Sequence, residues 1–443
     1  MLPSPWRARP RASLAAWVFG LVLLAPVLAP PLAAALAAAA SAPTFAAPIA
    51  LPDSTGFGEP GIAVAPDGTL YVVAPGTAVW RSSDAGASWE RVADTLGNSG
   101  DSDIAVDLDG LVYGSDLFDA APVSVSNNRA TSFQYVTDTN PGDEGLDREW
   151  IAVAGHGDVF ATVRDGGSEE LSVSHDRGQT FSSPRTVDLD TADRGNILAV
   201  SSLDLYIPYT DGTNGDMHLA ASHDGGTSWT VHTIGPTSGA SCDFPAVARD
   251  AAGTLYVVWC EILAIGYPQV SNARIQLAVS KDDGATWTGP LQLSDDANFN
   301  AFPWVAAGNA GRVMVAWYEG ASPISSIDPL HLRDPNLALL VDWHVTVGWS
   351  LDADQASPTW TRTVATGATH SGPICTEGIL CPPSTRNLLD FFEVVEMPGG
   401  NLAVTFAGGD VLGVPDLSGG GSVGTISQLY AMVQTAGSNL RTG

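Results

Sequence analysis

The chain has 443 residues, and 48 acidic against 19 basic side chains give it a formal net charge of −29 at pH 7. This acidic field repels phosphate backbones, and Lys281 is the only lysine, so nucleic-acid binding is excluded as its main role. Because 45% of the residues are apolar, the chain can bury a core and is not disordered throughout. Its 47 glycines and 30 prolines indicate many tight turns and few long helices.

The N-terminal segment has the pattern of a secretory signal peptide. Three arginines within residues 7–11 precede an apolar stretch over 15–36, and a run of small residues follows. We expect a signal peptide over 1–42 and a single mature domain over 43–443. A retained membrane anchor is the alternative, since the apolar stretch approaches membrane-spanning length. The mature chain is therefore expected to be secreted, with a periplasmic or cell-surface location as the variants of this prediction.

A repeat of four short strands fills the chain after residue 55. Each unit contains an apolar run, a glycine-containing turn, a second apolar run, a polar box and a closing strand. Seven units begin near Ile62, Ile104, Ile151, Leu198, Val247, Val305 and Val394. A period in the forties with four strands per unit predicts an all-β fold, the β-propeller. The longer spacings late in the chain indicate inserted loops over 262–273, 321–336 and 367–384.

The last unit lacks a recognisable fourth strand after residues 429–433. The segment 45–51 can supply that strand, which would pair the start of the chain with its end and close the ring. We therefore expect seven blades. Six blades, with one unit absorbed as an elaboration, is the alternative.

A polar box, Ser-x-Asp-x-Gly-x-Ser/Thr followed by an aromatic residue, occurs in four good copies. Its aspartates and aromatic residues are Asp84 with Trp89, Asp176 with Phe181, Asp224 with Trp229, and Asp282 with Trp287. A degraded copy lies at 126–133 and an interrupted one at 350–360. Asp and Ser can bond turn backbone, glycine permits a positive φ, and the ring can pack between blades. We therefore assign the boxes a structural role.

This box resembles the Asp-box, or BNR, repeat of the sialidase superfamily, and the resemblance covers almost the whole mature chain. In that family the boxes join the third and fourth strands of a blade, on the face opposite the active site. The resemblance implies that the functional face carries the starts of the first strands and the ends of the second strands. It further implies a glycoside hydrolase in which three arginines bind a carboxylate, a glutamate activates a tyrosine nucleophile, and an aspartate is the acid/base.

Suitable side chains occupy the predicted functional face. The starts of the first strands contain Glu59, Asp101, Asp103, Asp147, Arg148, Glu149, Trp150, Arg194, Asn196, Asp243, Phe244, Phe302, Trp304, Arg386, Asp390 and Glu393. From these, the candidates to bind an anionic sugar are Arg148, Arg194, Arg386, Glu149 and Trp304. The predicted nucleophile pair, at the end of a second strand, is Tyr318 with Glu319, and the predicted acid is Asp103, with Asp101 and Asp147 as alternatives.

Two functions remain open at this point. The first is a secreted, exo-acting sialidase-like hydrolase directed at extracellular glycans. The second is a non-catalytic propeller that binds polysaccharide or protein through the same face. No arginine occurs over residues 53–60, where the family's Arg-Ile-Pro-type motif would lie, and this favours the second function. The clustering of arginine, tyrosine and glutamate on the predicted functional face favours the first. In either case we expect a monomer with an extracellular glycan or glycoprotein as partner, with no nucleic acid and no membrane after signal cleavage.

The cysteines and histidines add a prediction about covalent and metal chemistry. An exported chain favours disulfides, and the blade pattern predicts the pairs Cys242–Cys260 and Cys375–Cys381, with free thiols or a crossed connectivity as alternatives. The eight histidines show no zinc-ligand spacing. The acidic run 138–147 could accept calcium but has no EF-hand spacing, so we expect no required cofactor.

Overall fold

The structure, a computed structural model, describes the following residues: 40–95, 100–117, 121–140, 146–188, 190–237, 244–265, 271–295, 297–321, 342–371, 388–409 and 427–442. They belong to one compact unit, Ala40–Gly443. Every regular element among them is a β-strand, and none of these residues forms a helix long and apolar enough to cross a membrane. The predicted all-β class is confirmed.

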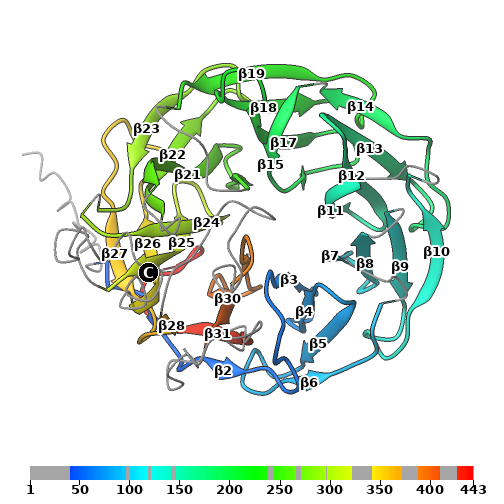
Figure 1. The fold of residues 1–443 in the computed structure, drawn as a ribbon, viewed down its shortest axis with the longest axis horizontal. Coiled ribbons are helices and arrows are strands. Elements are labelled where there is room, and N and C mark those ends of the chain that lie inside the picture. Colours follow the sequence, from blue (N-terminus) through cyan, green and yellow to red (C-terminus); the bar gives the residue numbers. More distant parts are fainter. Residues whose placement is uncertain are drawn as a thin grey trace, which may run out of the picture. The chain divides into compact units, whose positions relative to one another are not determined.

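The strands form seven antiparallel sheets around a common centre, and each sheet is one blade of a β-propeller (Figure 1). Blade 1 contains β3 (Gly61–Val64), β4 (Leu70–Ala74), β5 (Ala78–Ser82) and β6 (Glu90–Arg91). Blade 2 contains β7 (Asp101–Val106), β8 (Val112–Leu117), β9 (Pro122–Ser126) and β10 (Gln134–Asp138). Blade 3 contains β11 (Leu146–Ala154), β12 (Asp158–Asp165), β13 (Ser168–Ser174) and β14 (Arg185–Asp188).

The remaining four blades follow the same order. Blade 4 contains β15 (Thr191–Arg194), β16 (Leu198–Ala199), β17 (Leu205–Asp211), β18 (Met217–Ser222) and β19 (Thr230–Gly235). Blade 5 contains β20 (Ala246–Arg249), β21 (Leu255–Ile265), β22 (Ser271–Ser280) and β23 (Thr288–Gln292). Blade 6 contains β24 (Asn300–Ala307), β25 (Val313–Gly320), β26 (Asp342–Ser350), β27 (Thr361–Val364) and β28 (His370–Ser371). Blade 7 contains β29 (Val394–Glu396), β30 (Leu402–Gly408), β31 (Gln428–Ala436), β1 (Thr44–Phe45) and β2 (Ile49–Ala50).

The N-terminal strands close the ring. β1 pairs with β31 through Phe45 opposite Gln434, and β2 pairs with the same strand through Ile49 opposite Ala431. Without this pairing β31 would be an exposed edge, with unpaired backbone groups that invite association. Seven blades and closure by the segment around 45–51 are therefore confirmed, and the six-blade alternative is wrong.

Two of the predicted inserted loops contain ordered strand. Residues at the start and end of the 262–273 segment extend the β21–β22 hairpin, with Ile262 opposite Ala273. Within the 367–384 segment, β28 pairs with β26 through His370 opposite Trp343. Hydrogen bonding to an existing strand thus extends two blades into segments that were predicted to be loops from their length alone. The 321–336 segment lies almost wholly outside the described residues.

The polar boxes form one repeated hydrogen-bonded turn between the third and fourth strands of a blade. In blade 1, Ser82 Oγ and Ser88 N each donate to Asp84 Oδ1 at 2.8 Å, while Gly86 N donates to Ser82 Oγ at 2.9 Å. The same bonds recur in the turns that begin at Ser174, Ser222 and Ser280. Each aspartate is thus used within its own turn, which supports the structural assignment.

The degraded box keeps this hydrogen-bonding pattern although its sequence differs. Asn128 Oδ1 accepts from Ser126 Oγ at 2.9 Å and from Ser132 N at 3.0 Å. Ala130 stands where the good copies have glycine, and its φ is 59°. An amide oxygen can accept the same bonds as a carboxylate oxygen, so Asn preserves the turn.

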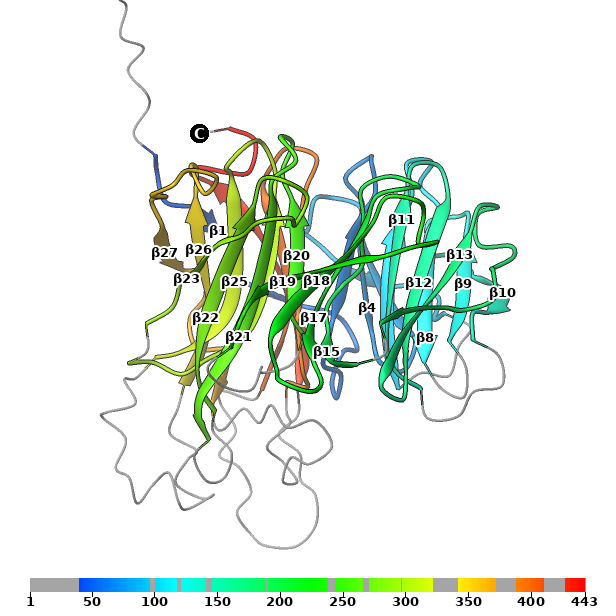
Figure 2. The same cartoon turned by 90° about the horizontal axis from the view of Figure 1, so that it is seen from above.

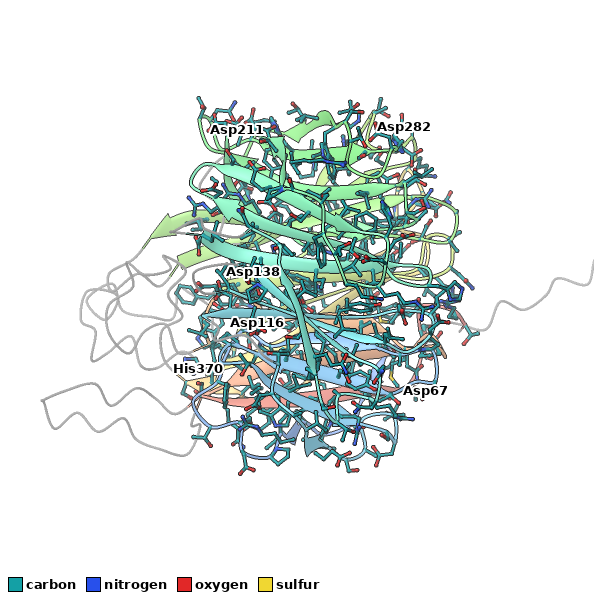
Figure 3. All side chains as sticks on the ribbon, turned by 90° about the vertical axis from the view of Figure 1, so that its right-hand side faces the viewer. Asp67, Asp116, Asp138, Asp211, Asp282 and His370 are labelled. Atoms are coloured by element: carbon teal, nitrogen blue, oxygen red, sulfur yellow. The ribbon has the colours of Figure 1, made fainter. Side chains whose placement is uncertain are left out.

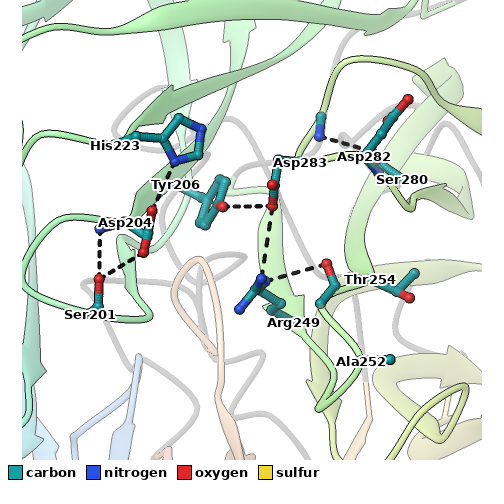
Figure 4. Close-up of polar contacts among 12 residues, drawn as sticks. Ser201, Asp204, Tyr206, His223, Arg249, Ala252, Thr254, Ser280, Asp282 and Asp283 are labelled. Carbon is teal, nitrogen blue, oxygen red and sulfur yellow. Dashed lines mark hydrogen bonds and ion pairs between the residues drawn. The ribbon is translucent and has the colours of Figure 1, made fainter.

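The box turns lie at the opposite end of the blades from the predicted functional face. Asp282, in a box, and Asp67 are at one end, whereas Asp211, the last residue of the second strand β17, and His370 are at the other (Figure 3). At the box end, Tyr206 of blade 4 donates its hydroxyl to Asp283 Oδ1 of blade 5 at 3.0 Å (Figure 4). The box end therefore ties neighbouring blades together, while the first strands begin at the other end.

Candidate functional site

The inner strands place a group of carboxylates where the first strands begin. Neighbouring inner strands contact one another, with β3 beside β7 and β7 beside β11 (Figure 1), and β29 also contacts β3. In the view turned by 90°, the inner strand β11 runs alongside β12 of the same blade (Figure 2). Glu393 Oε2 of blade 7 accepts from the Ile62 amide of blade 1 at 2.9 Å. Asp103 Oδ2 of blade 2 accepts from the Ile151 amide of blade 3 at 2.9 Å. Each of these two carboxyl groups thus joins neighbouring blades through a backbone amide, and this brings acidic side chains to the axis.

Arg148 lies among these carboxylates because its strand is irregular. The β11–β12 register shifts between Asp147 and Glu149, and Arg148 has a φ of 37°. A non-glycine residue with a positive φ is uncommon and costs about 1–3 kcal/mol, so the surrounding structure must hold it. The side chain is only 3% exposed. The bulge thus turns a long cationic side chain into the interior of the propeller.

The guanidinium of Arg148 is packed between aromatic rings. Its central carbon lies 3.8 Å from the Trp150 ring centroid, 4.2 Å from that of Phe391 and 5.6 Å from that of Phe244. Trp304 packs on Trp150 with 5.4 Å between ring centroids. Such stacking stabilises a cation by about 0.5–2 kcal/mol. It does not satisfy hydrogen-bond donors.

None of the three guanidinium nitrogens of Arg148 has a hydrogen-bond partner among the described residues. Burial disfavours the charged form, but the nearby carboxylates of Glu149, Asp101, Asp103 and Glu59 outweigh burial and raise the pKa of Arg148. The side chain is therefore a charged, buried group with unused donors. In native proteins the large majority of buried polar groups are hydrogen-bonded, so this arrangement calls for an explanation.

The acids around Arg148 hold protons more tightly than ordinary carboxyl groups. Burial raises the pKa of Asp103 to about 6, although Arg148 and two backbone amides act in the opposite direction. Burial raises the pKa of Glu149 well above its ordinary value, and one of its oxygens, Oε2, has no partner among the described residues. Burial and the negative charge of Asp103 raise the pKa of Glu393. The site therefore contains candidate proton donors.

We define the axial cluster as the following residues: Glu59, Asp101, Asp103, Arg148, Glu149, Trp150, Phe244, Trp304, Phe391 and Glu393. Four residues of the predicted site, Asp103, Arg148, Glu149 and Trp304, are thus brought together. Phe391 was missed, although it begins the Phe-Phe-Glu run that directly precedes β29, the first strand of blade 7. Its apolar side chain gave no chemical signal in the sequence.

Arg194 has a different environment from Arg148. Its Nε lies 3.2 Å from Glu169 Oε2, and its other nitrogens donate to the backbone carbonyls of Thr191 and Ala192. Burial lowers the pKa of Arg194 to about 10 and raises that of Glu169 to about 7. The carbonyl oxygen of Arg194 accepts a hydrogen bond from Trp150 Nε1 at 3.2 Å. Arg194 therefore supports the axial cluster through its backbone, while its side chain is committed to Glu169.

The predicted nucleophile pair is not brought together. Tyr318 is fully buried, and its hydroxyl donates to the carbonyl of Ala407 at 2.7 Å. Burial raises the pKa of this hydroxyl, which disfavours a nucleophilic phenolate. Glu319 accepts a hydrogen bond from Asn298 at 2.8 Å and pairs with Arg362 at 3.2 Å. Successive residues of a strand point to opposite faces, so Glu319 is not placed to activate Tyr318.

The remaining predicted residues divide into described and undescribed positions. Asp147, an alternative acid, is paired with the exposed Arg164 at 2.9 Å. Arg386, Cys242, Cys375 and Cys381 lie outside the described residues. Cys260 is buried and is not a free thiol, and both predicted disulfide pairings stay predictions. The described residues contain no group of three or more His, Cys, Asp or Glu arranged to hold a metal ion.

No family model matches this chain, and no curated protein matches it. Among solved structures, an ulvan lyase of polysaccharide lyase family PL25, bound to -[GlcA(1-4)Rha3S]-, is similar at 11% identity with a TM-score of 0.53, over 88% of this chain and 97% of that chain. YCF48 bound to a D1 peptide is similar at 12% identity, TM-score 0.49, over 89% and 96%. The intramolecular trans-sialidase from Ruminococcus gnavus is similar at 12% identity, TM-score 0.39, over 83% and 92%. At these identities the likeness concerns the fold alone.

Proposed function

We propose that this protein is an exported propeller that binds extracellular glycans at the axial cluster. The observation that carries the proposal is Arg148, a buried cation whose guanidinium donors have no partner among the described residues and which is held in place by a strand bulge. An unpaired buried polar group costs about 1–3 kcal/mol, and a charged one more. A ligand that supplies acceptors would recover this free energy on binding.

The surroundings of Arg148 suit a saccharide. Trp150, Trp304 and Phe391 form a buried aromatic lining, and Glu149 has an unpartnered carboxyl oxygen. Glycan sites in general combine apolar ring contacts with a small number of directed polar groups. The ulvan lyase with a similar fold shows that a propeller can host a polysaccharide site, and this supports the proposal only by analogy.

Exo-acting glycoside hydrolysis is the second candidate function. It is favoured by Asp103 and Glu149, because a carboxyl group with a raised pKa can donate a proton to a leaving oxygen near neutral pH. The placement of Tyr318 does not support the tyrosine-nucleophile form of this reaction. Hydrolysis in this protein would use the carboxyl groups of the axial cluster instead.

A glycan array tests the proposed binding function. The mature protein is compared with Arg148→Lys, which keeps the charge but loses the planar set of donors, and with Arg164→Lys, which makes the same change at an exposed ion pair. We expect at least one glycan class to bind, with affinity at least about tenfold lower for Arg148→Lys and unchanged for Arg164→Lys. Absence of binding to every glycan, or equal binding by all three folded proteins, would contradict the proposal.

The proposal includes export, which has its own test. N-terminal sequencing of protein recovered outside the cytoplasm is expected to give a first residue between positions 40 and 47. Protein that retains residues 1–39 and sediments with membranes would favour the anchor alternative. Protein found only in the cytoplasm would contradict export.

A further inference from the structure

The axial cluster contains more acidic than basic side chains. Its only arginine is Arg148, and five carboxyl groups surround it from blades 1, 2, 3 and 7 or the segments that lead into them: Glu59, Asp101, Asp103, Glu149 and Glu393. Arg194, the other described arginine predicted for this face, is committed to Glu169 and to backbone carbonyls. The charge of Arg148 is thus already balanced by carboxylates of the protein.

Most of these carboxyl groups have fixed backbone partners. Glu59 accepts from the Asp390 amide at 3.0 Å, and Glu393 accepts from the Ile62 amide at 2.9 Å. Asp103 accepts from the Ile104 amide at 2.7 Å and from Ile151. These contacts hold the carboxyl groups where the blades meet, so they cannot move away to make room for a second anion.

The groups that remain for a ligand are of two kinds. Arg148 offers N–H donors, and Glu149 Oε2 offers a carboxyl oxygen, with neither satisfied by the described residues. A sugar hydroxyl can both accept from the guanidinium and donate to the carboxyl oxygen. A ligand carboxylate can only accept, and it would meet the carboxylates of Asp101 and Asp103, which already act on Arg148, in a medium of low dielectric constant.

We infer that the axial cluster selects an uncharged, hydroxyl-bearing saccharide unit and rejects carboxylated sugars such as sialic or uronic acids. This inference rests on the proposed glycan-binding function and narrows its substrate class. It replaces the expectation that Arg148 binds the carboxylate of an anionic sugar. The chemical reason is that the guanidinium already interacts with the carboxylates of Glu59, Asp101 and Asp103 and has little attraction left for a further anion.

Access to this site requires movement of a side chain. Arg148 and Glu149 are 3% and 1% exposed, so a ligand cannot reach them in the conformation described. Of the three rings that contact the guanidinium, Trp150 and Phe391 are buried, whereas Phe244 is only half-buried. Phe244 is the least buried of the three rings, and we expect it to rotate when a saccharide enters.

Matched pairs of oligosaccharides test the inference. Each pair has the same stereochemistry and differs only at C6: oligoglucosides with oligoglucuronides, oligogalactosides with oligogalacturonides, and oligomannosides with oligomannuronides. Dissociation constants are measured at pH 7, where the uronates are ionised. For the pair that binds, we expect the dissociation constant of the neutral oligosaccharide to be at least about 30-fold lower than that of its uronate, which corresponds to about 2 kcal/mol.

A pair of variants separates the axial charge from the overall charge of this acidic protein. Asp101→Asn removes a carboxylate that acts on Arg148 and Glu149, and Asp147→Asn removes one from an exposed ion pair nearby in the sequence. We expect Asp101→Asn to reduce the preference for the neutral sugar at least about threefold and Asp147→Asn to leave it unchanged.

The outcomes distinguish the inference from the function on which it rests. Preferred binding of the uronate, or of a sialoside, through a site that Arg148→Lys abolishes would overturn the inference and leave glycan binding intact. Equal loss of preference in Asp101→Asn and Asp147→Asn would assign the selectivity to general surface charge and would also overturn it. No binding of any oligosaccharide would refute the proposed function and the inference together.

Discussion

The substitution Asp103→Asn provides a quantitative test of the charge arrangement in the axial cluster. Burial raises the pKa of this carboxyl group from its ordinary value of 3.8 to about 6. The folded protein therefore binds the proton more tightly than the unfolded chain does. The contribution of Asp103 to stability is fully present below about pH 4 and is lost as the pH rises through about 6. The two pKa values correspond to a loss of about 3 kcal/mol over this interval.

The assay is the free energy of unfolding, measured by urea denaturation between pH 4 and pH 8. We expect the natural protein to lose about 3 kcal/mol more stability over this range than Asp103→Asn does. Asp103 also raises the pKa of Glu393, so its removal reduces the pH-dependent loss from that residue as well. The control is Asp147→Asn, whose pH dependence should match that of the natural protein.

The side-chain amide introduced by Asp103→Asn would donate where the carboxylate accepts from Ile104 or Ile151, and this would lower stability at every pH. The quantity compared is therefore the change of the unfolding free energy with pH and not its value at one pH. Parallel curves for the natural protein and Asp103→Asn would refute the reasoning. They would mean that Asp103 is solvated, and that the inner strands do not enclose the axial cluster as described.

Three further predictions concern residues outside the ligand-binding groups. Tyr318→Phe leaves the Ala407 carbonyl without its donor and should cost about 1–2 kcal/mol in urea denaturation, with glycan binding retained; lost binding at unchanged stability would contradict the structural role. Arg194→Met leaves Glu169 buried without its cation and should destabilise by about 3–5 kcal/mol, and a neutral effect would show that this pair is not buried. Deletion of residues 40–51 removes β1 and β2, and we expect association through the exposed β31, seen as larger species in light scattering; a monodisperse, equally stable protein would contradict closure by these strands.

The fold was predictable because its signals repeat along the chain. A single box would be weak evidence, but four good copies and two imperfect ones mark the positions of third and fourth strands, and the apolar runs between them supply the other two. The closing strand was predictable because the last unit of the sequence lacks a recognisable fourth strand after residues 429–433. The strands inside the 262–273 and 367–384 segments were not predicted, because spacing reports only that residues are inserted and not whether they join a blade.

The site was predictable only in part. Asp103, Arg148, Glu149 and Trp304 lie together because the topology alone brings the starts of the inner strands to the axis. Which arginine is committed to a structural pair depends on contacts between distant strands, as for Arg194 with Glu169, and no sequence pattern reports them. The positive φ of Arg148 could likewise not be predicted from the sequence, because glycine or asparagine would be expected in such a conformation.

The adjacency of Tyr318 and Glu319 was the misleading signal. Both residues lie within β25, where the alternation of the strand separates their side chains. The apolar run that precedes them already indicated a strand. The period of two could therefore have argued against this pair from the sequence alone.

The most direct test of the account is a crystal structure of the protein with the oligosaccharide that binds best on the array. We expect a sugar hydroxyl within hydrogen-bond distance of the Arg148 guanidinium, with Phe244 rotated from its present position. A saccharide bound only at the box face, or an axial cluster unchanged and filled by ordered water, would contradict the claim that the axis of the propeller is the glycan site.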